Sequence, residues 1–181
     1  QSALVACPAF ADVTRFLKHV DGALGGSLWA FELMWNGFYR MVTTPPSKGT
    51  PPLPQTYDYY VLVESAGGDP ARDQAQFAEA IAAAIEAGLV VDAVVCSSEA
   101  QRDALWALRD DVEGIFRLGM PVAFDVSLPL AEMEGYVTEV VGRLEREWPA
   151  YSRFVFGHLG DGNLHIIAAG PPSAEARHGI E

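Results

Sequence analysis

Short apolar segments alternate along the chain with longer segments of helical periodicity, and proline or glycine separates most of them. Residues 3–7 form an apolar run of strand length that Pro8 ends. Residues 12–24 instead place their apolar side chains on one face at helical spacing, and this pattern stops at two consecutive glycines. The alternation indicates a sheet built from many short strands, with helices between them.

The same patterns predict the remaining elements and their order. Strands are expected at residues 27–34, 57–65, 89–96, 122–127, 153–156 and 164–169, and helices at residues 72–87, 98–118 and 130–148. The order β-α-β, loop, β-α-β, α-β-α-β-β favours an α+β fold in which helices cover a largely antiparallel sheet. The first two units resemble each other in plan, as in a duplicated ferredoxin-like arrangement.

The length of 181 residues suits one domain, or one compact domain of a larger protein, and half of the residues are hydrophobic. A segment rich in proline at residues 43–54 could link two domains, but neither side alone is long enough for an ordinary core. We therefore expect a single domain over residues 1–181. Both ends look cut, because the chain opens inside a strand and stops where a helix begins.

Charge and cysteine content exclude several classes of partner and location. A net charge of -12 and a pI of about 4.6 argue against a nucleic-acid interface and a polybasic membrane patch. The sequence has no apolar run of transmembrane length, no signal peptide and no glycine-rich nucleotide-binding loop. Cys7 and Cys96 are predicted to be buried free thiols rather than a disulfide, which suits a reducing, cytoplasmic location.

The most informative segment lies near the C-terminus, where two of the four histidines flank a glycine-rich stretch. Asp161-Gly162 between two apolar strands predicts a tight hairpin turn. His158 and His165 are nearly symmetric about that turn, so we expect them to face each other at roughly 5 Å between Cα atoms. Two such imidazoles could share zinc, iron, nickel or copper with a third ligand from elsewhere; the alternative is a pair of solvated hairpin histidines.

Residues 157–165, Gly-His-Leu-Gly-Asp-Gly-Asn-Leu-His, resemble the G-H-x-G-D-G-N-x-H signature of FAD-linked oxidases. That family includes D-lactate and D-2-hydroxyglutarate dehydrogenases and the glycolate oxidase flavoprotein subunit, and is of the vanillyl-alcohol-oxidase type. Two more segments are similar to the family in the same order: residues 105–109 match L-W-x-x-R, and residues 124–130 match the D-[VL]-[SA]-[VL]-P strand. The resemblance implies a C-terminal substrate (cap) domain, with the FAD-binding domain absent from this chain.

The resemblance also implies roles for individual residues. His158 and His165 correspond to the ligands of a divalent metal such as zinc or manganese, and His165 is also a candidate catalytic residue. Arg109 corresponds to the arginine that binds the substrate carboxylate, for which a bidentate guanidinium is well suited, and it is the other candidate catalytic residue. Its alternative is a helix-surface arginine paired with an acidic side chain. Asn163 is a candidate substrate-binding residue, with hairpin architecture as its alternative.

Three further acidic residues are assigned structural roles instead. Turn formation is preferred for Asp161, satisfaction of backbone donors for Asp125, and a solvated helix position for Glu113.

The chain departs from the family pattern in three places. The family's E-H-G segment, which supplies a third metal ligand and a candidate base, is expected beyond the end of this chain; Arg177-His178-Gly179 is a chance echo of it. Ala123 stands where D-2-hydroxyglutarate dehydrogenases carry lysine, and Ile167 where they carry asparagine. These apolar residues favour a smaller or more apolar substrate, similar to lactate or glycolate.

The implied function is oxidation of a D-2-hydroxy acid to the 2-oxo acid by the full-length enzyme, with FAD taking the hydride and an unknown acceptor reoxidising it. The isolated domain is expected to be inactive. One alternative is a stand-alone, ferredoxin-like module that binds a small metabolite without catalysis. A metal-dependent hydrolase is a weaker alternative, because the sequence has no H-x-x-E or E-x-x-H pattern.

Overall fold

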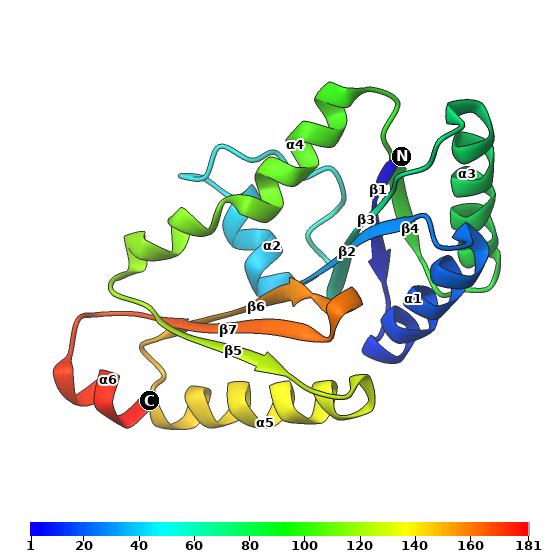
Figure 1. Ribbon diagram of the computed structural model, residues 1–181. Coiled ribbons are helices and arrows are strands. Elements are labelled where there is room, and N and C mark those ends of the chain that lie inside the picture. Colours follow the sequence, from blue (N-terminus) through cyan, green and yellow to red (C-terminus); the bar gives the residue numbers. More distant parts are fainter. Residues whose placement is uncertain (181) are drawn as a thin grey trace.

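A single antiparallel sheet of seven strands runs through the computed structural model, which describes residues 1–180 (Figure 1). The strand order is β4-β1-β3-β2-β6-β7-β5, and every neighbouring pair is antiparallel. The strands are β1 (Ser2–Cys7), β2 (Leu28–Trp35), β3 (Tyr59–Ser65), β4 (Asp92–Val95), β5 (Val122–Ser127), β6 (Ser152–His158) and β7 (Asn163–Ala169).

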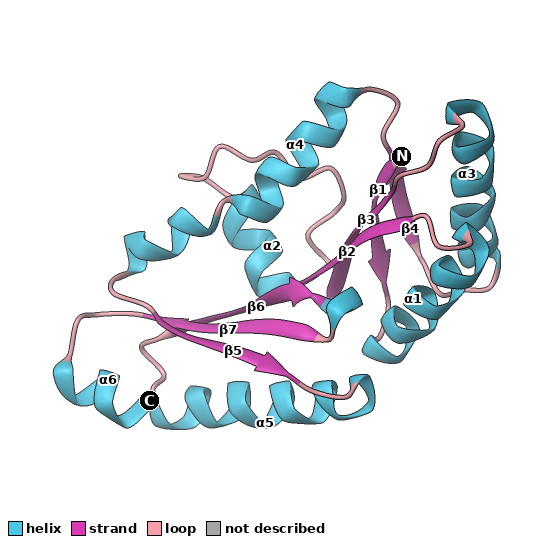
Figure 2. Ribbon diagram, in the orientation of Figure 1, coloured by secondary structure: helices cyan, strands magenta, loops and turns pink. Residues whose placement is uncertain are grey.

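Helices lie between the strands and pack on both faces of the sheet (Figure 2). The α-helices are α1 (Phe10–Leu24), α2 (Asn36–Thr43), α3 (Pro70–Glu86), α4 (Glu99–Asp110), α5 (Leu130–Glu147) and α6 (Ala174–Ile180). Two 3-10 helices, η1 (Val112–Leu118) and η2 (Leu159–Asp161), complete the described elements. The predicted α+β fold with an antiparallel sheet is confirmed. The first four strands, with α1 and α3, have the β-α-β-β-α-β order of a ferredoxin-like unit, whereas duplication of that unit stays a prediction.

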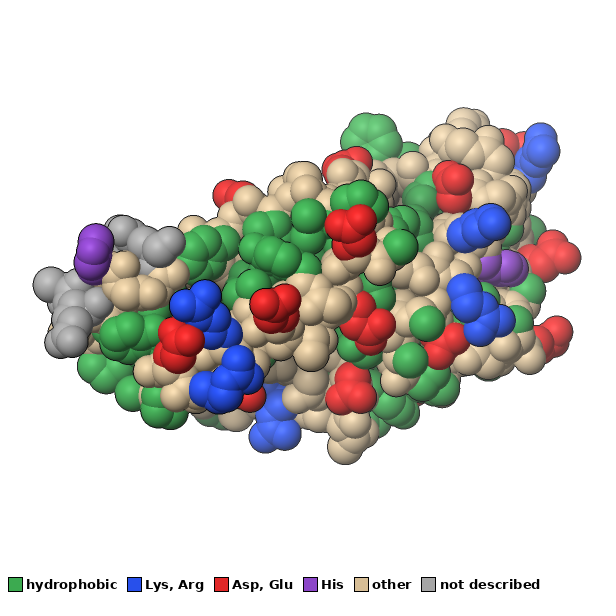
Figure 3. All heavy atoms as spheres, turned by 90° about the horizontal axis from the view of Figure 1, so that it is seen from below, with side chains coloured by type: hydrophobic (Ala, Val, Ile, Leu, Met, Phe, Trp, Pro, Cys, Tyr) green, Lys and Arg blue, Asp and Glu red, His purple; other side chains and the backbone are tan. Residues whose placement is uncertain are grey.

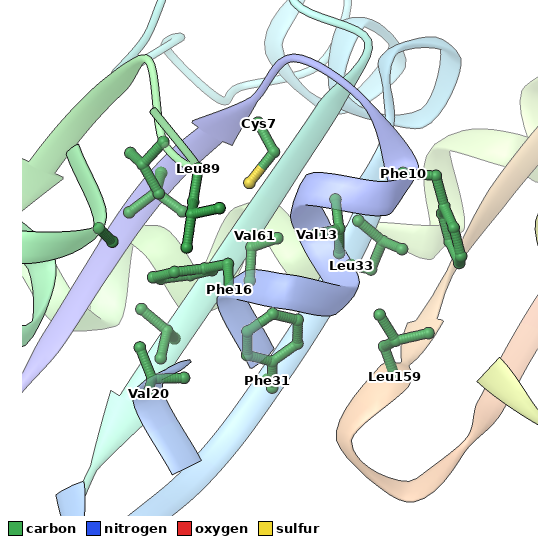
Figure 4. Packing of buried hydrophobic residues seen from close by; sticks show 14 of the residues in the cluster. Cys7, Phe10, Val13, Phe16, Val20, Phe31, Leu33, Val61, Leu89 and Leu159 are labelled. Atoms are coloured by element: carbon green, nitrogen blue, oxygen red, sulfur yellow. The ribbon is translucent and has the colours of Figure 1, made fainter. Parts of the chain in front are cut away.

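One face of the sheet packs against α1, α3 and α5. Phe16 of α1 contacts Phe31 of β2 with ring centroids 5.6 Å apart, and both belong to the larger buried cluster (Figure 4). The strand β1, second from one edge of the sheet, is buried along its whole length because helices cover both sides of it. Its uniformly apolar sequence follows from that position, since a strand covered on both faces has no solvent-facing side.

The opposite face packs against α2, α4 and η1. Phe38 of α2 stacks on Phe156 of β6 at 4.0 Å, and Tyr39 stacks on Tyr60 of β3 at 3.7 Å. The Tyr39 hydroxyl also donates to the carbonyl of Leu53 and accepts from its N–H, which holds the proline-rich segment against α2. This face carries the candidate site described below.

The strands β2 and β6 join two parts of the sheet through three residue pairs, Glu32–His158, Leu33–Gly157 and Met34–Phe156. On one side of this seam lie β4, β1, β3 and β2, and on the other lie β6, β7 and β5. Residues from the N-terminal and C-terminal parts of the sequence therefore meet there.

One helix was not predicted from the sequence, and the predicted extent of another was wrong. The helix α2 was not predicted, because Asn36-Gly37 at its start are poor helix formers and its stability comes from the aromatic contacts of the next two residues. The single helix expected at residues 98–118 is interrupted at Asp111, whose ψ of 50° is not helical. The carboxylate of Asp111 accepts a hydrogen bond from the Ser47 hydroxyl at 2.7 Å, so a tertiary contact favours the break.

Both cysteines are free thiols, as predicted; Cys7 is buried, but Cys96 is only partly so. On the face seen from below, acidic and basic side chains are interspersed with hydrophobic ones and form no broad basic area (Figure 3). None of the helices within residues 1–180 has the length and apolar character that crossing a membrane requires.

Candidate functional site

The glycine-rich motif forms the turn between β6 and β7, as its sequence predicts. The 3-10 helix η2 makes the turn and Gly162 ends it with a φ of 70°, where its N–H donates to the carbonyl of Leu159 at 3.0 Å. Gly157 precedes the turn with a φ of 156°, and a Cβ at this position would lie 2.7 Å from the carbonyl oxygen of Asn163. Leu159 is fully buried in the cluster that also contains Phe31 and Leu33, which fixes the turn to the core (Figure 4).

The strand register places one polar row across four neighbouring strands. Glu32 of β2 pairs with His158 of β6, and His165 of β7 pairs with Phe156 of β6 on one side and with Asp125 of β5 on the other. Because paired residues, and residues two apart in a strand, share a face, all of these side chains lie on the α2 and α4 face. The row therefore contains two histidines, flanked at its ends by carboxylates.

The expectation that His158 and His165 face each other directly was wrong. The partner of His165 on β6 is Phe156, because η2 and Gly162 set a register two residues away from the expected pairing. The two imidazoles are diagonal neighbours instead, with ring centroids 5.5 Å apart and planes at 86°. Their rings are nevertheless close enough to contact the same small molecule.

His158 is held between two charged side chains. Its Nδ1 lies 2.7 Å from Oε1 of Glu32, and its Nε2 lies 3.3 Å from Nη2 of Arg109. The side chain of His158 is 45% exposed, whereas that of Glu32 is 6% exposed. A buried carboxylate thus supports a histidine that is accessible from solvent.

Arg109, in the last turn of α4, is buried rather than solvated. Its Nε donates to Oε2 of Glu32 at 2.8 Å, its guanidinium carbon lies 5.3 Å from the centre of the Phe156 ring, and its side chain is 9% exposed. Arg109 is therefore not a helix-surface arginine, although it does pair with an acidic side chain, as that alternative expected. Nη1 lies 3.6 Å from the exposed carboxylate of Asp110 and makes no hydrogen bond within the described residues.

His165 has a carboxylate partner on the opposite side of the row. Its Nδ1 hydrogen bonds to Oδ1 of Asp125, whose side chain is 74% exposed on the edge strand β5. The role preferred for Asp125 from sequence, satisfaction of backbone donors, is replaced by this contact. The side chain of His165 is 25% exposed and its ring lies 5.2 Å from that of Phe156.

Asn163 contacts β5 rather than the charged cluster. Its amide nitrogen lies 3.3 Å from the hydroxyl of Ser127, its partner in the β5–β7 register. This contact agrees with a part in the hairpin architecture. Asp161 forms the last residue of the η2 turn, and Glu113 is exposed on η1, both in keeping with the structural roles expected of them.

Glu32 was missed by sequence reasoning. It is the only charged residue in β2, whose sequence is Leu-Trp-Ala-Phe-Glu-Leu-Met-Trp, and it is 4% exposed. An acidic residue inside an otherwise apolar strand is the signal that could have found it, because a buried carboxylate requires a partner.

The site does not by itself complete a metal centre. Within residues 1–180, no group of three or more His, Cys, Asp or Glu side chains is arranged to hold a metal ion. The two imidazoles would supply part of a coordination shell. The described residues contain neither of the phosphate-binding patterns G-x-G-x-x-G and G-x-x-x-x-G-K-[ST].

The chain is similar to the C-terminal domains of known FAD-linked oxidases and to part of several D-2-hydroxyglutarate dehydrogenases. The family model described as "FAD linked oxidases, C-terminal domain" matches residues 1–180. The mitochondrial D-2-hydroxyglutarate dehydrogenase of Bos taurus is 34% identical over 166 residues, which cover 91% of this chain and 30% of that protein. The D-2-hydroxyglutarate dehydrogenase of Xanthomonas citri pv. viticola is 36% identical over 120 residues, covering 66% of this chain and 25% of that protein.

A third relative and a solved structure extend the comparison. A mitochondrial Schizosaccharomyces pombe protein, whose name gives D-lactate dehydrogenase as a provisional activity, is 31% identical over 173 residues, covering 90% of this chain and 32% of its own. A structure of alkyldihydroxyacetonephosphate synthase shares the fold with a TM-score of 0.60 at 9% identity, covering 99% of this chain and 38% of that one. The chain thus spans about 30% of the length of the curated relatives that it matches.

Proposed function

Because the chain belongs to the FAD-linked oxidase C-terminal domain family, we propose that it holds the substrate of a flavin-dependent oxidoreductase that oxidises a D-2-hydroxy acid to the 2-oxo acid. The observation that carries this proposal is the meeting of Arg109 with His158 and His165 on one face of the sheet. A 2-hydroxy acid carries a carboxylate next to a hydroxyl. It therefore needs a cationic group and a proton acceptor side by side.

Arg109 is proposed to bind the substrate carboxylate. Glu32 holds the Nε side of the guanidinium, so the planar fork is fixed while Nη1 is left for an additional acceptor. A fixed fork loses little conformational entropy when it binds a carboxylate. A guanidinium held in this way orients the acid as well as attracting it.

His165 is proposed to take the hydroxyl proton through its Nε2. With Nδ1 hydrogen bonded to Asp125, Nε2 is the nitrogen left to face a substrate. The O–H bond then breaks with its proton on His165, while C2–H leaves as a hydride and C2–O becomes a carbonyl. Acceptance of that hydride is the chemistry that FAD supplies when it is bound.

We propose a small substrate, similar to lactate or glycolate. Ala123 and Ile167 face each other in the β5–β7 register, two register pairs along from Asp125 and His165, on the same face of the sheet. Neither side chain can donate a hydrogen bond, so a second carboxylate at this end of the site would find no donor in this pair.

A divalent metal and a cytoplasmic location are also proposed rather than established. A zinc or manganese ion held by His158 and His165 is an alternative use of these rings, in which Nε2 of His165 would not take the proton, and it would require a third ligand from outside the described residues. Metal content measured in the flavin-containing protein, with H158A and H165A beside it, tests this proposal. Unchanged content in both variants would exclude it.

The central experiment replaces Arg109 in the flavin-containing protein of which we propose this chain to be a part. With D-lactate as substrate, R109M should raise KM or lower kcat/KM by about 10- to 100-fold, because a charge-assisted hydrogen bond contributes about 1.5–3 kcal/mol. R109K should lose less, since it keeps the charge but not the fork. R143M, which removes an exposed arginine from α5, is the matched control. Wild-type kinetics in R109M would contradict the proposed role.

A further inference from the structure

Both histidines of the polar row use the same ring nitrogen to contact a carboxylate. Nδ1 of His158 contacts Glu32, and Nδ1 of His165 contacts Asp125. We propose that Glu32 and Asp125 are positioning residues, which fix both imidazoles with Nδ1 protonated, so that Nε2 of His158 accepts from Arg109 and Nε2 of His165 is presented to the substrate. The role of these contacts in the reaction rests on the proposed function, whereas the contacts themselves are observed in the structure.

The two contacts of His158 are compatible with one tautomer only. An ionised carboxylate can only accept a hydrogen bond, so Nδ1 of His158 must donate to Oε1 of Glu32. A guanidinium can only donate, so Nε2 must accept from Nη2 of Arg109. The neutral ring with hydrogen on Nδ1 satisfies both neighbours, whereas the other tautomer satisfies neither.

Glu32 is placed to act on two functional side chains at once. Its Oε1 contacts His158 and its Oε2 contacts Arg109, at 2.7 and 2.8 Å. The carboxylate is 6% exposed, so little water competes for these oxygens. Glu32 contacts no proposed substrate atom and is almost fully buried. It therefore affects the reaction only through His158 and Arg109, which it holds in place.

Asp125 reaches His165 from the other end of the row. It lies on the edge strand β5, directly opposite His165 in the register, and its side chain is mostly exposed. Its contact is therefore independent of the buried Glu32–Arg109 pair. The two carboxylates approach the histidines from opposite sides, and between them the rings lie 5.5 Å apart.

The combined arrangement explains why each histidine is paired with an acid. A neutral imidazole alternates between tautomers unless a partner fixes one of its nitrogens, and a carboxylate at Nδ1 fixes the hydrogen on that atom. Of two rings fixed in the same way, His158 accepts from Arg109 through Nε2, and His165 keeps Nε2 as the acceptor for a hydroxyl. That is the arrangement needed to orient and deprotonate a hydroxyl beside a carboxylate held by Arg109.

The test is the tautomer of each histidine, measured in the ¹⁵N-histidine-labelled chain by long-range ¹H–¹⁵N correlation. In the wild type, we expect hydrogen on Nδ1 as the major form at both His158 and His165. E32Q should shift His158 alone from Nδ1–H to a mixture of tautomers, because one amide oxygen cannot accept from both Nδ1 of His158 and Nε of Arg109. D125A should release His165 alone to a mixture of tautomers.

Two matched controls separate this effect from a general loss of carboxylates. E64Q changes a glutamate of the adjacent strand β3 that accepts from Trp106 and Ser2, and it should alter neither histidine. D92A removes the aspartate of the other edge strand, β4, which accepts from Tyr57, and it should be equally silent. A shift of either tautomer in these controls would contradict the assignment of the effect to Glu32 and Asp125.

The proposal stays testable even if E32Q fails to fold. A wild-type spectrum with hydrogen on Nε2 of His158 would overturn it without any variant. R109K, which keeps the positive charge, should leave His158 unchanged; a reversal there would assign the tautomer to Arg109 instead. Hydrogen on Nδ1 of both histidines in a protein that oxidises no 2-hydroxy acid would overturn the proposed function alone. A protein that oxidises the acid, but whose E32Q variant keeps the wild-type tautomer of His158, would overturn the positioning role alone.

Discussion

Nε of Arg109 lies 2.8 Å from Oε2 of Glu32, although the two residues are 77 positions apart in the sequence. One stands in the last turn of α4 and the other in the middle of β2, and both are almost fully buried. The pair fastens the helix to the sheet at the edge of the candidate site. It also places a full negative charge where a hydrophobic residue would ordinarily pack.

Removal of the Glu32 charge should therefore destabilise the fold. E32A leaves a guanidinium buried without its counter-charge, and loss of one partner of a buried pair costs about 3–5 kcal/mol. Urea unfolding followed by circular dichroism measures the difference. E147A, which breaks the exposed Arg143–Glu147 pair of α5, should cost less than about 1 kcal/mol. Equal losses in the two variants would refute the special position of Glu32.

A side chain at Gly157 should disturb both the fold and the site. In G157A the new Cβ would meet the carbonyl oxygen of Asn163 and the Cα of Leu164 at 2.7 and 2.8 Å, at a φ that favours glycine. We expect a loss of about 2–4 kcal/mol in the free energy of unfolding. G135A in α5, where nothing lies within 4 Å, should instead gain about 0.5–1 kcal/mol. Thermal melts of the two variants should move in opposite directions.

Stability should fall at alkaline pH because of Cys7. Burial raises the pKa of this thiol from 9.0 to about 12, so the folded chain keeps its proton where the unfolded chain loses it. The stabilisation is complete below pH 9 and is lost as pH rises from 9 to 12, by up to about 1.4 kcal/mol per unit. C7A should reduce this slope between pH 9 and 10 and leave the part that comes from Cys96, whose pKa burial also raises. An identical slope in C7A would show that other groups cause it.

The substrate preference should follow Ala123 and Ile167. In the flavin-containing protein, A123K with I167N adds a cation and an amide two register pairs along from Asp125 and His165, on the same face of the sheet. The double variant should gain activity on D-2-hydroxyglutarate relative to D-lactate, by about 10-fold or more for one new charge-assisted contact. The ratio of the two kcat/KM values is the measurement. A wild type that already uses D-2-hydroxyglutarate as well as D-lactate would contradict the proposed small substrate.

The sequence predicted the strands and most helices because their patterns are local. Apolar runs, helical periodicity and Pro or Gly at the boundaries located all seven strands within three residues at each end. The short helix α2 could not be found in this way, since its stability depends on Phe38 and Tyr39 stacking on other strands. The break at Asp111 likewise depends on Ser47 in a distant loop.

The site was predictable in its histidines and arginine but not in the residues that hold them. The motif gave His158, His165 and Arg109 by resemblance, whereas Glu32 carries no local signal beyond its presence in an apolar strand. The expected opposition of the two histidines failed because the register depends on the turn conformation, and a shift of two residues exchanges His158 for Phe156. Pairing between distant strands decides such contacts.

The seam between β2 and β6 gives the site a mechanical role in the sheet. One of its three residue pairs, Glu32 with His158, belongs to the polar row, so sliding of one part of the sheet against the other would pull these side chains apart. A bound acid that contacted side chains from both parts of the sheet would stabilise the pairing of β2 with β6. Amide exchange at Leu33 and Gly157 would then slow on ligand binding, although neither residue touches the ligand. Ligand binding at the polar row and the pairing of β2 with β6 would then be coupled, so that each changes the stability of the other.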